Sequence, residues 1–166
     1  MKPHFLALTL AALSAIPATA QTTSSTDAPP AAQNIMASNP QDIAAKLQDF
    51  GYRAELTKDE QGDPKIKSSA GGANFSVYFY GCDNNVDCTS IQLSAGFDLD
   101  AGTTLEVINE WNAGKRYGKV YLDDEKDPYI EMDIELEGAG IPVETFRMNM
   151  ETWDKIVADF QTHIDW

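Results

Sequence analysis

The sequence predicts an α+β domain in which an antiparallel sheet is covered by helices on one face. Two observations support this class. Apolar and polar residues alternate along several short segments, a period typical of strands with one buried and one solvated face. Three other segments have helical spacing and lie before, between and after runs of strands, whereas parallel βαβ winding would alternate single strands with helices.

The expected order of elements is α-β-β-β-β-α-β-β-α. Asn39 and Pro40 suit the cap and first position of the first helix, and Gly51 ends it. Residues 103–106, Thr-Thr-Leu-Glu, have the form of a capping box and begin the second helix, which Gly114 ends. The inner side of this second helix is expected to carry Leu105, Ile108 and either Trp111 or Asn112.

Six segments are expected to be strands, in a run of four and a run of two, the latter forming a hairpin. These segments are residues 53–57, 65–69, 74–80, 89–97, 117–122 and 129–136. Alternation assigns their inward side chains, which in the third, fourth and sixth segments are Phe75, Val77, Phe79, Ile91, Leu93, Ala95, Phe97, Ile130, Met132, Ile134 and Leu136. Tyr78 and Tyr80 then lie on the opposite face, as do Glu131, Asp133 and Glu135, whose like charges are typical of a solvated face.

The longest helix is expected at residues 143–164. Its apolar residues recur at intervals of four and three and form one continuous stripe, wide enough to cover a sheet. These residues are Phe146, Met150, Trp153, Val157, Phe160 and Ile164. Such a stripe is typical of a core face, and the alternative is an exposed docking surface.

The N-terminus has the three parts of a secretory signal peptide. Lys2 supplies a positive charge, residues 5–16 form an apolar run too short to span a bilayer, and residues 18–20, Ala-Thr-Ala, form a cleavage site. We expect a signal peptide at 1–20 that is cleaved after Ala20, and a periplasmic or secreted protein. Residues 21–38, rich in Thr, Ser, Ala and Pro, predict a disordered leader before a domain at 39–166.

The chain is acidic, with a formal net charge of −14. Such a charge opposes binding to nucleic acid or to an anionic membrane surface. No further apolar segment reaches membrane-spanning length, so membrane insertion is not expected.

The sequence offers little that could support catalysis, and we expect a protein that is not an enzyme and carries no cofactor. Past the predicted cleavage site, His163 is the sole histidine, and HExxH, CxxC, GxSxG and phosphate-loop motifs are absent. Glu131, Asp133 and Glu135 could pair as glycosidase carboxylates, which leaves a hydrolase as a third hypothesis.

Acidic loops raise the alternative of a small bound cation such as calcium. Twelve-residue calcium loops that start at Asp59, Asp83 or Asp123 lack both the glycine at the sixth position and the glutamate at the twelfth. No metal ligand set is therefore predicted, and these segments are interpreted as polar turns.

Cys82 and Cys88 are the two cysteines of the chain and could form a metal site, a redox pair or a disulfide. Zinc would need further ligands, and reactive pairs are more often spaced CxxC. In an oxidising compartment two nearby cysteines persist as a disulfide. We therefore predict a disulfide that closes the hairpin loop between the third and fourth strands.

Residues 108–112, Ile-Asn-Glu-Trp-Asn, and 117–122, Tyr-Gly-Lys-Val-Tyr-Leu, resemble the YbjN family. Residues 142–146 and the helix around 153–160 resemble its closing segment, so the likeness covers about 39–164. The resemblance implies an α+β fold similar to type III secretion chaperones, which bind partner polypeptides and often form homodimers. It supplies no catalytic or ligand-binding residues. Four strands before the second helix, where those chaperones have three, argue against transferring their dimer geometry.

We therefore predict a non-enzymatic, chaperone-like module that recognises a protein or peptide partner in the periplasm. Aromatic side chains often anchor such interfaces. The candidate partner surface consists of Tyr78, Tyr80, Trp111 and Tyr121, with core packing as the alternative for Trp111. A structural or envelope-stress protein that binds a small cation is the second hypothesis.

Overall fold

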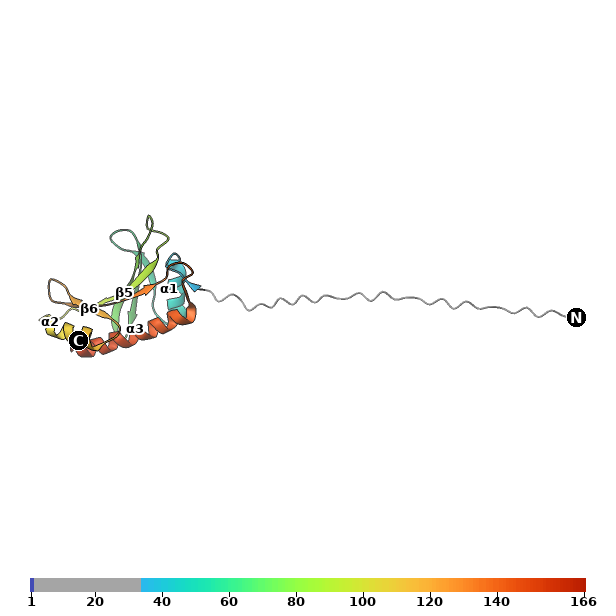
Figure 1. Ribbon diagram of the computed structural model, residues 1–166. Coiled ribbons are helices and arrows are strands. Elements are labelled where there is room, and N and C mark those ends of the chain that lie inside the picture. The colour runs from blue at the N-terminus through green and yellow to red at the C-terminus, as the bar shows by residue number, and fades with distance from the viewer. Residues whose placement is uncertain (2–33) are drawn as a thin grey trace.

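A computed structural model describes residues 34–166 together with Met1 (Figure 1). Residues 2–33, which hold the rest of the predicted signal peptide and most of the predicted leader, lie outside the described residues. The described chain is a mixed α+β structure, as predicted, with a six-stranded antiparallel sheet of order β2-β3-β4-β5-β7-β6 and a separate two-stranded pair, β1-β8. The elements are β1 (Asn34–Ile35), α1 (Pro40–Asp49), β2 (Glu55–Lys58), β3 (Pro64–Ala70), β4 (Ala73–Tyr80), β5 (Ser90–Gly96), α2 (Leu105–Gly114), β6 (Lys119–Leu122), β7 (Pro128–Glu135), β8 (Ile141–Pro142) and α3 (Val143–His163).

The helices cover one face of the large sheet. α3 runs along the sheet, with α1 near its N-terminal end and α2 near its C-terminal end (Figure 1). The ring of Phe75 on β4 meets Trp153 of α3 edge to face at 5.6 Å. Phe160 lies about two turns further along α3. The centre of its ring is 5.5 Å from that of Phe97 and 4.9 Å from that of Trp111 on α2. The predicted apolar stripe of the last helix is thus the core face of α3, and all six of its residues are buried.

The N-terminal boundary differs from the predicted one. Ile35 is completely buried, and β1 pairs with β8 in the register Ile35–Ile141. Residues 34–38, assigned to the predicted disordered leader, therefore belong to the folded domain. Strands of two residues are too short to show a period, which is why neither β1 nor β8 was predicted.

The start of α2 also corrects a prediction. Leu105 is the first residue of the helix and its side chain is 65% exposed, while Ile108 and Trp111 are buried as expected. Helical spacing predicts which side of α2 a residue lies on, but it does not show whether the sheet extends far enough to cover that residue.

α2 closes the outer edge of β6 with side chains. The Asn112 amide donates to the Val120 carbonyl and accepts from the Val120 N–H, both at 3.1 Å. Trp111 Nε1 donates to the Gly118 carbonyl at 2.8 Å. An edge strand presents unpaired backbone groups to solvent. These contacts satisfy backbone groups of β6 and the residue before it that a neighbouring strand would otherwise pair.

Candidate functional site

The sheet face opposite the helices, called the open face below, carries a connected set of polar and aromatic side chains. Alternation along each strand turns these side chains outward, and the register of the strands sets them side by side. One row crosses four strands, from Lys65 on β3 through Tyr78 and Gln92 to Asp133 on β7.

Hydrogen bonds hold this row in place. Lys65 Nζ donates to the Tyr78 hydroxyl at 2.9 Å and lies 4.4 Å from the centre of the Tyr78 ring. Gln92 Nε2 donates to Asp133 Oδ1 at 2.8 Å. Side chains that are already fixed lose less conformational entropy when a partner binds, so the row suits recognition.

A second cluster surrounds Glu131 on β7. Glu131 accepts hydrogen bonds from the Tyr121 hydroxyl at 3.0 Å and from Lys119 Nζ at 2.8 Å. Burial, followed by the hydrogen bond to Glu131, raises the pKa of Tyr121, and the bond to Glu131 raises the pKa of Lys119. Both groups stay protonated at neutral pH. Glu131 itself is only 9% exposed, so the prediction of a fully solvated acidic face is wrong at this position.

Tyr129 connects this cluster to the middle of the sheet. Its ring stacks on Tyr121 with centroids 5.4 Å apart and an interplanar angle of 13°. Tyr129 also covers Gly96, where a side-chain Cβ would come within 2.5 Å of the ring. The glycine is required there by the close approach of the aromatic ring.

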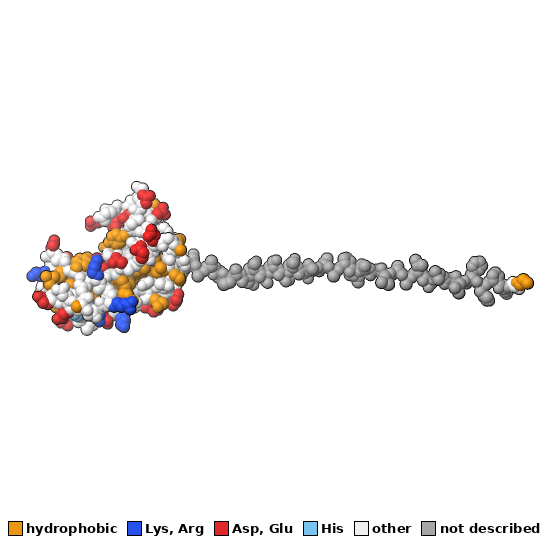
Figure 2. Space-filling model, viewed as in Figure 1, with side chains coloured by type: hydrophobic (Ala, Val, Ile, Leu, Met, Phe, Trp, Pro, Cys, Tyr) orange, Lys and Arg blue, Asp and Glu red, His pale blue; other side chains and the backbone are white. Residues whose placement is uncertain are grey.

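A groove of about 670 Å³ crosses the open face. Small residues contribute to its floor, because Ser76 of β4 pairs with Ser94 of β5 and Gly96 follows two residues later. In the view of Figure 2 the molecule is hollowed between the projecting hairpin loops and the end that carries α2, with acidic side chains on both sides.

The walls of this open-face groove carry opposite charges. Arg53 and Lys67 line one side. The other side is lined by Asp98, Asp123, Glu125 and Asp127, which come from the β5–α2 and β6–β7 loops. Among the described residues, no ion pair involves any of these six side chains.

The structure brings together three of the four predicted surface aromatics. Tyr80 and Tyr121 are exposed on the open face, and Tyr78 lines the groove. Trp111 is 1% exposed and packs in the core, so it does not belong to this surface. The groove itself was not predicted. The groove could have been inferred from Ser76 and Ser94, two small residues that alternation places on the outward face of neighbouring strands.

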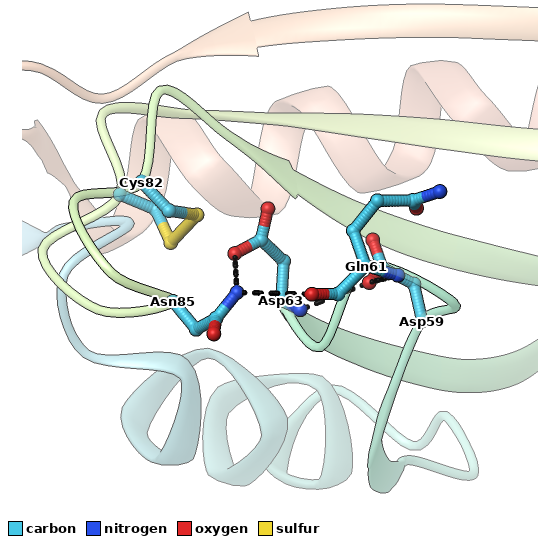
Figure 3. The surroundings of a disulfide bond; sticks show 6 residues. Asp59, Gln61, Asp63, Cys82 and Asn85 are labelled. Carbon is cyan, nitrogen blue, oxygen red and sulfur yellow. Dashed lines mark hydrogen bonds between the residues drawn. A yellow bond between two sulfur atoms is a disulfide. The ribbon is translucent and has the colours of Figure 1, made fainter.

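Cys82 and Cys88 form the predicted disulfide, which closes the loop between β4 and β5. Asn84, Asn85 and Asp87 within this loop have positive φ, a conformation that Asn and Asp tolerate better than most residues. Asn85 reaches across to the β2–β3 turn and donates to Asp63 Oδ1 at 2.7 Å and to the Gln61 carbonyl at 3.3 Å (Figure 3). The loop thus braces a neighbouring turn.

The remaining candidates for chemistry have structural roles. His163 Nε2 lies 2.8 Å from the Val107 carbonyl, and its ring packs beside Trp111 and Phe160. Within residues 34–166, no cluster of three or more His, Cys, Asp or Glu is placed to hold a metal ion. No helix in the described part of the chain is long and apolar enough to cross a membrane.

The comparisons with known proteins agree with the resemblance at residues 108–122. No curated protein matches the chain. The sequence model of the YbjN family, described as "Putative bacterial sensory transduction regulator", matches residues 39–166. This match includes all three helices of the described chain and the whole six-stranded sheet, and the chain belongs to the YbjN family.

Proposed function

We propose that this protein is a non-enzymatic binding module of the bacterial periplasm that recognises a protein or peptide partner through its open face. The single observation that carries this proposal is the groove on a sheet face that no helix of the described chain covers. It is lined by Tyr78, which accepts a hydrogen bond from Lys65, and by Tyr129, which stacks on Tyr121. The family's description as a regulator supports a role in binding.

Capture of partners from a periplasmic extract tests the binding site. Ser94→Trp fills the floor of the groove, whereas Asn109→Trp places the same ring on an exposed site of α2. The proposal expects the first variant to lose proteins that the second still captures, and the double variant Tyr78→Ala, Tyr80→Ala to lose the same set. Equal recovery by all variants would contradict it.

The location is tested separately, by fractionating cells that express the full chain. The proposal expects the protein in the periplasmic fraction, with an N-terminus at Gln21 after processing. An unprocessed cytosolic chain would contradict this part while leaving the binding site open to test.

A further inference from the structure

We propose that the open-face groove takes an extended peptide segment that carries a lysine or arginine, and that the acidic wall receives its cation. This inference rests on the proposed function and adds the chemical class of the partner. It is carried by the distribution of charge in the groove, together with the aromatic ring that lies beside it.

The acidic wall is preorganised. Asp123 Oδ1 accepts from the backbone N–H groups of Glu125 and Asp127, both at 2.9 Å, and Asp127 Oδ1 accepts from the Leu99 N–H at 3.0 Å. Each carboxylate keeps a second oxygen that makes no hydrogen bond within the described chain. These bonds fix two carboxylates before a partner arrives, which lowers the entropic cost of binding.

No cation of the described chain forms an ion pair with this wall. Lys126 belongs to the same loop and lines a neighbouring hollow together with Asp98, Glu125 and Asp127, but it does not line the groove and forms no ion pair with them. Carboxylates in a concave surface focus a negative potential and raise the local concentration of cations. The wall is therefore electrostatically complementary to a basic side chain.

The arrangement fits a long organic cation better than a metal ion. Residues 34–166 offer no converging group of three or more metal-ligating side chains, so the carboxylates are spread along the groove. Tyr129 lines the same groove and is held flat by its stack on Tyr121. A lysine or arginine can lay its aliphatic stem and charge on such a ring.

The rest of the groove suits the main chain of the same peptide. Ser76 and Ser94 place hydroxyl groups at the floor, where peptide N–H and C=O groups could bond to them. Arg53 and Lys67 on the opposite wall lack ion-pair partners among the described residues, and they favour an acidic side chain at the other end of the segment. Opposite walls of this kind fix the direction in which a peptide lies.

Fluorescence anisotropy with synthetic peptides tests the inference on the purified protein. The probe is a labelled nine-residue Ser/Thr peptide with a central lysine, and the matched probe has uncharged norleucine at that position. We expect binding of the lysine probe that weakens as salt is added, and at least tenfold weaker binding of the norleucine probe.

Matched protein variants locate the site. Asp98→Asn with Glu125→Gln should weaken binding of the lysine probe about tenfold. Glu110→Gln with Glu137→Gln removes the same charge from exposed positions outside the groove and should leave it unchanged. Equal affinity for the two probes, no binding of either, or equal effects of the two double variants would overturn the inference. The proposed function would still stand if Ser94→Trp abolished partner capture.

Discussion

At the residue scale, Tyr52 links the end of α1 to α3. Its hydroxyl donates to Asp154 Oδ2 at 2.6 Å, and its ring packs edge to face against Phe75 at 6.3 Å. Burial is the main cause that raises the pKa of Tyr52, and the bond to Asp154 adds to it. The folded protein therefore holds this proton more tightly than the unfolded chain does.

Removing the hydroxyl should cost stability at neutral pH. Tyr52→Phe leaves the half-buried Asp154 without its donor, and we expect a loss of about 1–2 kcal/mol in the free energy of unfolding. Urea denaturation at pH 7 measures it. Tyr117→Phe is the control, because Tyr117 is exposed and makes no hydrogen bond within the described chain, and it should change stability by less than about 0.5 kcal/mol.

The same proton gives an alkaline pH dependence. The contribution of Tyr52 is fully present below the unfolded tyrosine pKa of about 10 and is lost as pH rises through the higher folded value. Urea denaturation from pH 9 to 11 should show stability falling above about pH 10, with a smaller fall in Tyr52→Phe. Identical slopes for the two proteins would contradict this assignment.

At the element scale, the Cys82–Cys88 disulfide closes the β4–β5 loop, and Asn85 of this loop bonds to the β2–β3 turn. In the chain-entropy model, closing a loop of about seven residues stabilises by about 2.4 kcal/mol. Cys82→Ser with Cys88→Ser should lower the melting temperature by roughly 10 °C. Reductant should lower the melting temperature of the natural protein and not that of the variant. An unchanged melting temperature in the double variant would refute the stabilising role.

The closure of β6 by α2 gives the Trp-Asn pair of residues 111–112 a physical role. Asn112→Ala removes both bonds to Val120 and should destabilise by about 1–3 kcal/mol, measured by urea denaturation. Asn109→Ala, at an exposed position about one turn nearer the start of α2, should have little effect. Because the freed edge can pair with another chain, the Asn112 variant should also self-associate in light scattering. A monomeric variant of natural stability would contradict this role.

The elements with a clear period could be predicted from the sequence, and so could the sides of most of their residues, Leu105 of α2 excepted. The alternation in β4, for example, separates Tyr78 and Tyr80 from the buried Phe75, Val77 and Phe79. β1 and β8 could not be predicted, since two residues show no period. Spacing on α2 does not show what the helix packs against, so the sequence alone does not decide between core and surface for Trp111.

The groove depends on information that no single strand carries. Its serine floor and its charged walls come from register across β3, β4 and β5 and from two loops that meet beyond the strand ends. Its tyrosine border could be predicted from alternation alone. The depth of the groove and the opposite charges of its walls could not be predicted, because they depend on how the strands and loops come together in the folded sheet.

At the scale of the whole molecule, the two faces of the sheet differ in what they carry. The helix-covered face buries the core aromatics, while the open face holds the groove and its hydrogen-bonded tyrosines. The net charge of −14 keeps the surface acidic, so Arg53 and Lys67 stand out as a local exception beside an acidic wall. A partner that matched this pattern would bind in one orientation.

Site-specific photocrosslinking in intact cells tests the central claim, that the open face binds a partner, most directly. A photoreactive residue is placed at Ser94 in the groove or at Asn109 on α2, in the full chain with its signal peptide. We predict a discrete crosslinked protein or peptide from Ser94 and none of the same mass from Asn109. The same products from both positions, or none from the groove, would contradict the claim.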